Sequence, residues 1–412
     1  MQRRSAISPK DFLDTVFFLN QNNSPSLSEY SIGLSQRGIT ASKQAIDKRF
    51  NESTKAMLSK LLEQAIGHRL LSKSRKAANK RWFTDIHIMD SSEFAVSKRA
   101  AEVFPGYGGE GRESLVQVQF EYQLLAGKVT TLSIGSALDS DSIAGMKNLE
   151  GIPPKTLLLR DLGYCSPKVF KELGRKDLYF ISRAKSQWNF YTLQDGRYQL
   201  LTTSEIINKL NQAQGKYIDL DVFVGEQART PVRLIANLLT DDQRERRLKK
   251  KSARRKLGRD AMEAIGLNLF VTNVGRENCA PSGIYELYTL RWQVELVFKT
   301  WKSVMQVHKI HSMNPVRLEC IILIKLLWVM LNWSIVHYLK RLTGLDLSPH
   351  KIIRTISGPL KRISGSIIKE SRLFADWLTD LCRISGRHHL KEYRKGSKSI
   401  STILLQATSK CP

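Results

Sequence analysis

Residues 288–302 read YTLRWQVELVFKTWK and carry the most distinctive pattern in the chain. Four polar side chains stand there at offsets of 3, 7 and 14 residues from the first, namely Tyr288, Arg291, Glu295 and Lys302. At about 100° per residue, these offsets fall on one stripe of an α-helix roughly 60° wide and about 21 Å long. A carboxylate flanked by cations over that length could follow several phosphates of a nucleic-acid backbone. We therefore predict a helix that forms the exposed edge of a nuclease site.

The same stretch predicts how this helix is held. A second, apolar arc contains Leu287, Leu290, Val294, Val297 and Trp301. A helix with one apolar flank packs that flank against a core and leaves the other flank accessible. We expect the polar stripe to stay open to a ligand.

The charge of the chain agrees with an anionic partner. Lysine and arginine number 65 against 38 acidic residues, a net charge of +27 over 412 residues, and the calculated pI is about 9.9. Such an excess favours association with polyanions and makes it dependent on salt. The alternative is a soluble protein that is merely basic. With 42% hydrophobic residues, the chain can bury one large core and one or two smaller units.

Cysteines and apolar windows indicate the compartment. The five cysteines are scattered and odd in number, which favours a reduced, cytosolic setting without a disulfide framework. The N-terminal residues lack the uninterrupted apolar segment of a signal peptide. The most apolar window, CIILIKLLWVMLNWSIVHYL at 320–339, is broken by Lys325, Asn332 and His337. We expect a buried helix here rather than a membrane span.

Residues 1–76 are expected to be helical. Ser26 and Glu29 have the spacing of a capping box, and Gly38 can end a helix before the next one begins. Two short helices joined by such a turn suggest a helix-turn-helix unit. Its second helix would present these residues to DNA: Lys43, Gln44, Lys48 and Arg49. An ordinary helical hairpin with a solvated basic face is the open alternative.

The residue patterns divide the remaining chain into four parts. Residues 77–185 alternate strand and helix patterns, which predicts a mixed α/β layer. Residues 186–263 contain four strand-like segments and end in a basic arm with ten cations between Arg244 and Arg259. Residues 264–372 resume with a buried strand, GLNLFVTNV, and continue into helices. Residues 373–412 are expected to form a basic helix and a frayed tail.

Two aspartates complete a candidate metal site. Asp90 ends the strand-like segment FTDIHIMD, and Asp161 ends KTLLLRD. A carboxylate at the C-terminal end of a strand, followed by a tight turn, sits at the open edge of a sheet where ligands bind, and Glu295 could face these two from its helix. Together they could hold two divalent ions for phosphodiester cleavage. A strand-terminal aspartate is also a common turn former or helix cap. We regard four nearby acids as structural: Asp85, Glu93, Asp139 and Asp141.

This combination resembles the DDE transposases of bacterial insertion sequences, specifically the IS-four type family. The family's signature Tyr-x2-Arg-x3-Glu-x6-Lys fits residues 288–302 at every position. Four neighbourhoods are also similar to the family: IMDSS, RDLGY, FISRAK and FVTNV, at 88–92, 160–164, 180–185 and 270–274. The resemblance is strong over about 82–310, moderate at the N-terminus and weak in the tail.

The resemblance implies an α/β fold with an RNase H-like catalytic core, in parts 77–185 and 264–372. A β-rich insertion interrupts the core, an all-α DNA-binding region precedes it, and a helical C-terminus follows. It also implies that Asp90, Asp161 and Glu295 bind two Mg²⁺ ions, which Mn²⁺ can replace. With these ions such an enzyme nicks DNA at the end of its element and directs the freed 3′-hydroxyl against a second strand. Relatives pass through a DNA hairpin before they integrate elsewhere.

The resemblance further assigns DNA contacts and partners. Tyr288 and Arg291 would contact phosphates near the transposon end and Lys302 the 5′ side, while Arg183 and Lys185 would help to hold terminal DNA. The alternative is that Arg291 or Lys302 is a surface cation paired with Glu286 or Glu295. The partners would be double-stranded DNA, as transposon ends and target, and a second copy in a paired-end homodimer. The enzyme would work on the bacterial nucleoid in the cytoplasm, with neither a membrane nor a small-molecule substrate.

One position departs from the family. A well-studied relative stacks a flipped base on a tryptophan where this chain reads GLNLF at 266–270. Trp292, Phe270 or Trp188 could substitute, because stacking needs only an aromatic face.

Two other functions stay open at the level of sequence. One is a stand-alone RNase H-like nuclease without strand transfer, and the other is a DNA-binding protein derived from a transposase. The helix-turn-helix-like region and the basic arm argue against the first, and the complete set of acids argues against the second.

Overall fold

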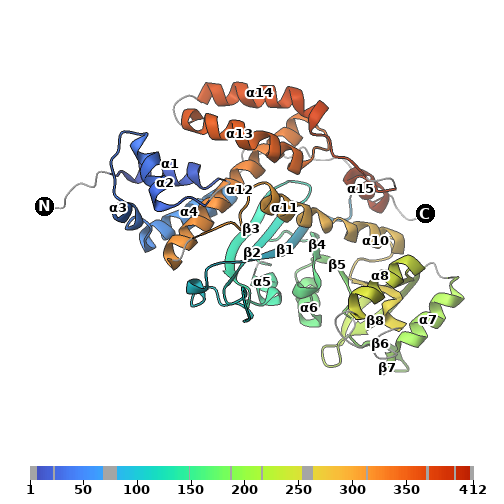
Figure 1. The fold of residues 1–412 in the computed structure, drawn as a ribbon. Helices are drawn as coiled ribbons and strands as arrows, with labels where there is room; N and C mark the ends of the chain where they lie inside the picture. The colour runs from blue at the N-terminus through green and yellow to red at the C-terminus, as the bar shows by residue number, and fades with distance from the viewer. Residues whose placement is uncertain are drawn as a thin grey trace.

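The computed structural model describes residues 7–21, 24–67, 81–147, 149–185, 188–214, 217–252, 263–311, 314–367, 371–393 and 396–408. Its strands are β1 (Ile86–Ala95), β2 (Leu115–Gln123), β3 (Val129–Ser136), β4 (Leu157–Arg160), β5 (Tyr179–Arg183), β6 (Phe190–Gln194), β7 (Arg197–Leu201), β8 (Ile218–Val224), β9 (Thr230–Leu238) and β10 (Leu267–Thr272). Within the described residues they form one ten-stranded sheet in the order β3-β2-β1-β4-β5-β10-β9-β8-β6-β7 (Figure 1). The chain is therefore a mixed α/β protein, as its sequence predicts.

The sheet has a parallel central part and antiparallel parts on either side of it. β1, β4 and β5 run parallel to one another, whereas β2 and β3 are antiparallel at one end. β10 joins β5 and β9 in antiparallel register, so β6–β9 extend the same sheet instead of forming a separate one. All four strands predicted for 186–263 are present. The basic arm begins as α8 (Asp241–Ser252), and residues 253–262 of the arm lie outside the described residues.

Helix α7 (Thr203–Gln212) stands between β7 and β8, where we expected only strands. Its start carries a complete capping box, in which Thr202 and Glu205 bond to each other's backbone N–H groups. That sequence signal was sufficient to find the helix. Ile206 and Leu210 bury its apolar side.

Helices cover both faces of the sheet, and the alternation of β2 shows why. Its residues Val118 and Phe120 face one core, together with α11 (Trp292–Ser303) and α12 (Pro315–Thr343). The residues between them, Gln117, Gln119 and Glu121, are polar and equally buried, because successive side chains of a strand point to opposite faces. The second core lies under α6 (Pro167–Arg175) and α7. Figure 1 shows α6 and α11 on opposite sides of the sheet.

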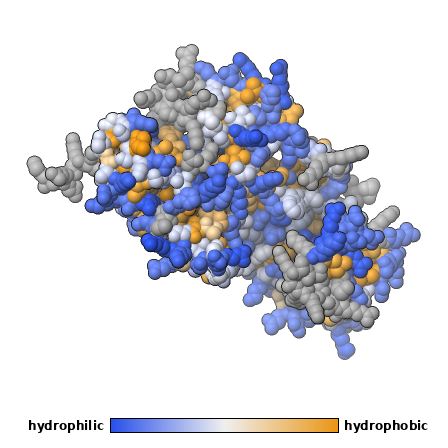
Figure 2. Space-filling model, viewed as in Figure 1, coloured by the Kyte–Doolittle hydropathy of each residue, from blue (hydrophilic) through white to orange (hydrophobic). Residues whose placement is uncertain are grey.

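The apolar window at 320–339 lies within α12. This helix is long and apolar enough to cross a membrane, but 78% of its most apolar window is buried inside the protein. Lys325 in its middle donates to the backbone oxygen of Gln306 at 3.2 Å. The prediction of a buried core helix is confirmed. In the view of Figure 2, hydrophilic side chains cover most of the described surface and apolar ones gather in small patches.

The N-terminal region is helical, as predicted: α1 (Pro9–Leu19), α2 (Leu27–Ser35), α3 (Lys43–Asp47) and α4 (Glu52–Gly67). The capping box of Ser26 and Glu29 is present, and Gly38 adopts the positive φ of +77° that ends a helix. The expected recognition helix is short, because α3 has only five residues. Lys43 and Lys48 are exposed. Arg49 lies beyond α3 and donates to the carbonyl of Ile7, and its contact with DNA stays a prediction.

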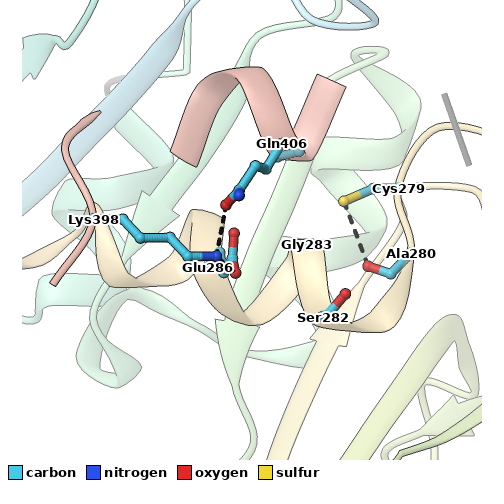
Figure 3. A pocket seen from close by; sticks show the side chains of 8 residues that line it. Cys279, Ala280, Ser282, Gly283, Glu286, Lys398 and Gln406 are labelled. Atoms are coloured by element: carbon cyan, nitrogen blue, oxygen red, sulfur yellow. Dashed lines mark hydrogen bonds and ion pairs between the residues drawn. The ribbon is translucent and has the colours of Figure 1, made fainter. Parts of the chain in front are cut away.

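The C-terminal helices are α13 (Pro349–Ile367), α14 (Ser371–His388) and α15 (Ile400–Thr408). The expectation of a frayed tail is wrong, because α15 packs against α10 (Pro281–Thr289). Lys398 joins the two helices by contacting Glu286 of α10 and Gln406 of α15 beside a small cavity (Figure 3).

Candidate active site

Asp90 and Asp161 lie side by side on neighbouring strands. β1 and β4 pair in parallel from Ile86 opposite Leu157 to Met89 opposite Arg160. The next residue on each strand is an aspartate, so the two carboxylates reach the same level of the sheet. The register thus brings Asp90 and Asp161, which directly follows β4, close together, and their catalytic role stays a prediction.

The prediction that Asp90 ends its strand is wrong. β1 continues to Ala95, because β2 stays paired with it after β4 has ended, as far as Ala95 opposite Leu115. Apolar alternation did not predict this continuation, because Ser91 and Ser92 are polar. Asp90 therefore sits on a strand that is held on one side only, where a ligand can approach the other.

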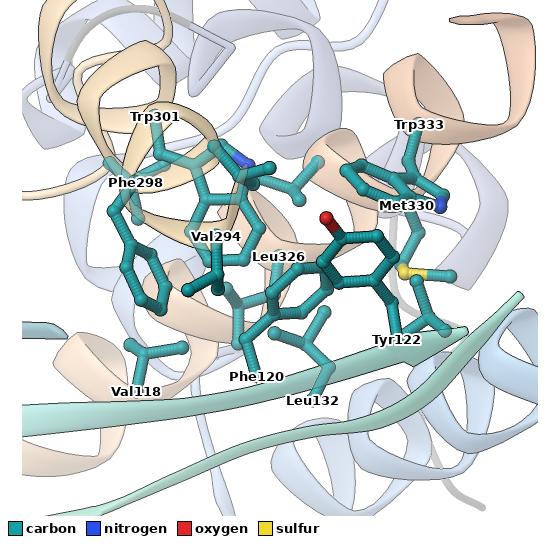
Figure 4. Close-up of a cluster of buried hydrophobic side chains, with 14 of the residues drawn as sticks. Val118, Phe120, Tyr122, Leu132, Val294, Phe298, Trp301, Leu326, Met330 and Trp333 are labelled. Atoms are coloured by element: carbon teal, nitrogen blue, oxygen red, sulfur yellow. The ribbon is translucent and has the colours of Figure 1, made fainter. Parts of the chain in front are cut away.

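Helix α11 brings Glu295 to this pair. Val294, Phe298 and Trp301 on its apolar side pack onto Phe120 of β2, with the ring centroid of Trp301 4.9 Å from that of Phe120 (Figure 4). Trp333 of α12 packs in the same cluster, and its ring centroid lies 5.3 Å from that of Phe120. The predicted apolar arc is confirmed, because Leu287, Leu290, Val294, Val297 and Trp301 are all buried. The arc fixes the rotation of α11, and Glu295 consequently faces β1.

The signature stretch is not one helix. α10 ends at Thr289 and α11 begins at Trp292, and the turn between them is tighter than an α-helix. The N–H of Arg291 bonds to the carbonyl of Tyr288, and that of Val294 to the carbonyl of Arg291, three residues back in each case. The single straight stripe predicted from 100° per residue therefore breaks at Arg291.

Tyr288 is buried, contrary to the expectation of an accessible phenol. It is 6% exposed, and its ring packs edge-on against Phe270 with 5.2 Å between centroids. Burial raises the pKa of Tyr288 to about 12. Its hydroxyl has no hydrogen-bond partner among the described residues. The Cζ atom of Arg291 lies 5.9 Å from the ring centroid of Tyr288, and a contact between Tyr288 and a phosphate stays a prediction.

Arg291 joins two of the three carboxylates. Its guanidinium donates to Asp90 Oδ2 at 3.1 Å and to Glu295 Oε1 at 2.6 Å. The side chain is buried rather than exposed, and it lies 5.6 Å from the ring centroid of Trp292. The guanidinium is thus the counter-ion of the acidic site in this state. Its pairing with Glu295 is the predicted alternative to a DNA contact, whereas its bond to Asp90 was not predicted.

The electrostatics show that negative charge converges here. The pKa of Asp90 is raised to about 6, mainly by burial and to a smaller extent by the charges of Asp161 and Glu295. The N–H of Ser91 and the guanidinium of Arg291 act in the opposite direction. Asp161 precedes a short 3-10 turn, η2 (Leu162–Tyr164), but its side chain makes no capping bond to that turn. The alternative interpretation of Asp161 as a helix cap is therefore wrong.

The donor set suits a hard divalent cation. Carboxylate oxygens are the ligands that Mg²⁺ and Mn²⁺ prefer. Among the described residues, however, no group of three His, Cys, Asp or Glu side chains is close enough to hold an ion directly. Arg291 lies between Asp90 and Glu295 and supplies the positive charge. A metal fits these residues chemically, provided that Arg291 leaves them.

The four competing acids all have structural contacts. Asp85 accepts the N–H groups of Ile86 and Leu125 at 2.7 and 3.1 Å. Asp141 accepts from the side-chain amides of Gln117 and Gln119 at 3.2 and 2.9 Å. In the same way, Asp139 accepts the N–H of Ser136, and Glu93 accepts the hydroxyl of Tyr107.

Other candidate DNA contacts surround the site. Lys302 is exposed at the end of α11, and its ammonium donates to the carbonyl of Glu93 on β1 at 3.1 Å. Arg183 ends β5, and its charge acts on the buried phenol of Tyr288. The ammonium of Lys185 lies 5.6 Å from the ring centroid of Trp188.

The three candidate stacking aromatics differ in exposure. Phe270 is 2% exposed, and Trp292 is 57% exposed. Trp188 packs edge-on against Phe170 at 5.5 Å. Phe270 is excluded as a platform for a base, and Trp292 offers a free face next to Arg291.

A buried ion pair lies directly behind Asp161, and sequence reasoning missed it. Arg160 donates to Glu121 Oε1 of β2 at 2.8 Å and to the carbonyl of Gly145 at 2.7 Å. Burial works against the charged carboxylate, but Arg160 and His87 hold the pKa of Glu121 well below its usual range. The signal was present in two places: an arginine that ends the apolar strand LLLR, and a polar residue at every second position of β2.

Comparison with known proteins shows the family of the chain. The Transposase DDE domain family matches residues 81–331, more than half of the chain. The chain is 29% identical over 394 residues to the transposase for insertion sequence element IS231F of Bacillus thuringiensis subsp. israelensis, covering 89% of this chain and 81% of that protein. It is 29% identical over 440 residues to the transposase for insertion sequence element IS1151 of Clostridium perfringens, covering 98% and 91%. A piggyBac transposase in a synaptic complex with hairpin DNA aligns with a TM-score of 0.47 and 11% identity, over 97% of this chain and 81% of the other.

Proposed function

We propose that this chain, which belongs to the Transposase DDE domain family, cuts and joins DNA at the terminal inverted repeats of its own insertion sequence. The family membership makes it an enzyme of DNA strand cleavage and transfer. One observation carries the assignment of the site: Asp90 and Asp161 stand at the same level of two parallel strands, and Glu295 shares Arg291 with Asp90. We propose these three as the catalytic acids.

The catalytic core is proposed to be RNase H-like. The order β3-β2-β1-β4-β5, with β1, β4 and β5 parallel, supports this. On this basis residues 77–185 and 264–372 form the core, and 186–263 form the insertion that continues its sheet. Residues 1–76 bind DNA through a helical unit that presents Lys43 and Lys48, and 373–412 form the C-terminal part.

Asp90, Asp161 and Glu295 would hold two Mg²⁺ ions, or Mn²⁺ in their place. When bound, such ions lower the pKa of water and stabilise the charge that develops on a phosphate under attack. The chain's own part is to hold the three carboxylates in register and to release Arg291 from them. A guanidinium freed in this way can donate two parallel bonds to a DNA phosphate. We propose that Arg291, once free of the carboxylates, binds a DNA phosphate in this way.

Lys302 is proposed to grip a phosphate beside the site, with Arg183 and Lys185 holding terminal DNA. Replacing Lys302 by alanine should weaken binding of an end-containing duplex severalfold and lower the salt dependence of binding by about one counterion. Fluorescence anisotropy across a series of salt concentrations measures both. Lys171 on α6, exposed on the opposite face of the sheet, is the matched control. An unchanged salt slope for Lys302→Ala would remove Lys302 from the interface.

Trp292 is proposed to stack the flipped base that a hairpin intermediate requires. Its exposed ring supports this, whereas Phe270 is buried and Trp188 is packed. Trp292→Ala should preserve the first nick and lose the hairpin product, because base stacking contributes about 1–3 kcal/mol. Trp292→Phe should restore it in part. Denaturing gels of end-labelled substrate separate the two products, and an unchanged hairpin yield in the alanine variant would exclude Trp292.

The decisive products distinguish the three functions. An end-labelled duplex with the inverted repeat, incubated with Mg²⁺ and a plasmid target, should give nicked, hairpin and joined DNA. Nicked DNA without joined DNA would indicate a stand-alone nuclease. Binding without any cleavage would indicate a repurposed DNA-binding protein. Because two ends must be joined, we propose a homodimer that holds both, acting on the nucleoid in the cytoplasm.

A further inference from the structure

A cavity of about 640 Å³ lies beside α11, apart from the three catalytic acids. It is enclosed by the turn between β2 and β3, by α11, by the end of α12, by the start of α13 and by the segment after α14. None of the three acids is among the described residues that line it. The volume is in the range of small-molecule sites.

The walls of the cavity have two chemical characters. One wall is apolar and includes Leu125, Leu296, Val297 and Trp333. The rest is cationic, with these side chains at the lining: Lys299, Lys340, Arg341, Lys351 and Lys391. Glu392 is the single carboxylate among the described lining residues, and it is already paired with Lys351 at 2.5 Å. The cavity therefore has an excess of positive charge next to an apolar surface.

Lys340 makes no ion pair among the described residues, and the charge of Asp346 acts on it without a direct contact. Its side chain is half-buried, and burial lowers its pKa to about 8. Within the described residues, its ammonium has neither a hydrogen bond nor an ion pair in the structure. A cation near the C-terminal end of α12 is favourable, but that does not explain an ammonium withdrawn from water beside an open volume. Desolvating a charge is costly unless an opposite charge accompanies it.

The N-terminal end of α13 adds to the positive potential of the cavity. Ser348, Pro349 and His350 line the cavity, and Ser348 Oγ accepts the N–H of Lys351 as a helix cap. The positive end of the dipole of this 19-residue helix therefore lies at the cavity. Lys391, whose ammonium donates to Gln293 Oε1 at 2.8 Å, lies near it. Phosphate groups bind at sites of this kind.

We propose that this cavity binds one nucleotide, with its phosphate near Lys340 and the start of α13 and its base against the apolar wall. Two sources share this chemistry. One is a free nucleotide, and the other is a nucleotide of a DNA strand that crosses α11. Lys299 connects the cavity to the active site, because it lies four residues, or about 6 Å of helix rise, beyond Glu295. The binding itself does not depend on cleavage chemistry.

The test measures binding to the full-length protein in EDTA, where the acidic site holds no metal. The probes are deoxyadenosine monophosphate, by titration calorimetry, and a fluorescent single-stranded 12-nucleotide DNA, by anisotropy. Lys340→Met removes the unpaired charge at similar volume. Ala126→Trp places an indole at the cavity from an exposed position and leaves every cation in place. Lys171→Met on α6 removes one exposed charge from the opposite face as the control.

Both cavity variants should weaken at least one probe about tenfold or more, the loss expected for one charge-assisted contact to a phosphate, and Lys171→Met should not. Loss for the mononucleotide identifies a free-nucleotide site. Loss for the 12-mer alone identifies a nucleotide of a DNA strand. Equal affinity of wild type and both cavity variants for both probes, or no binding of either probe, would overturn the proposal. DNA cleavage, measured separately with Mg²⁺, tests the proposed function independently.

Discussion

Replacing Asp161 by asparagine should reduce metal-dependent DNA cleavage by at least about a thousandfold, which corresponds to about 4 kcal/mol of transition-state stabilisation. The carboxylate of Asp161 makes no capping bond to the turn that follows it. The fold therefore has little need of its charge, and the near-isosteric variant should unfold at the same temperature as wild type. Binding of an end-containing duplex should be retained. Single-turnover cleavage of labelled duplex, together with thermal unfolding, measures both effects.

Asp139→Asn is the matched control for this variant. Its carboxylate accepts the N–H of Ser136 at 2.9 Å, a bond that an amide oxygen can also make, and it lies outside the proposed site. Cleavage by this variant should stay within about threefold of wild type. A cleavage rate for Asp161→Asn as high as that of the control would exclude Asp161 from the site.

Replacing Glu121 by leucine should lower the free energy of unfolding by about 3–5 kcal/mol, because the change leaves Arg160 buried without its counter-ion. Both members of the pair are almost fully buried, with side-chain exposures of 1% and 3%. Arg160 immediately precedes Asp161, so the same change should also disturb the position of the catalytic acid. Denaturant unfolding of the full-length protein measures the first effect.

The double variant Glu121→Leu with Arg160→Leu tests the cause of this loss. Removing both charges should recover most of the stability that the single change removes, because apolar side chains of similar volume can replace a buried ion pair. Equal destabilisation by the single and double variants would show that packing, and not the unpaired charge, is responsible.

The spacing of apolar residues predicted those features that a single helix or strand determines by itself. The apolar arc around Val294 and Trp301 gave the correct buried side of α11, because core packing enforces one orientation of a helix. The apolar patterns around Asp90 and Asp161 predicted two strands, because short apolar runs between turns are characteristic of buried strands. That these strands are parallel neighbours was found only in the structure. The family resemblance then supplied the pairing of the strands with the helix.

Features that depend on a partner element could not be predicted in this way. The end of β1 is set by its pairing with β2 and not by its own residues, so Asp90 lies inside a strand. The break at Arg291 is a local tightening between two helices that each pack separately, and it buries Tyr288 against Phe270. The bridge from Arg291 to Asp90 joins residues 201 positions apart. Propensity and spacing carry no information on such contacts.

The most direct test of the account is Mg²⁺-dependent cleavage of a labelled duplex that carries the element's own end, by wild type and by Glu295→Ala. Wild type should cleave the duplex, and the variant should bind DNA without cleaving it, because the variant lacks one of the three acids. Equal cleavage by both proteins would contradict the assignment of Glu295 as the catalytic glutamate. Binding without cleavage by both would contradict the assignment of this site as a working DNA-cleavage centre.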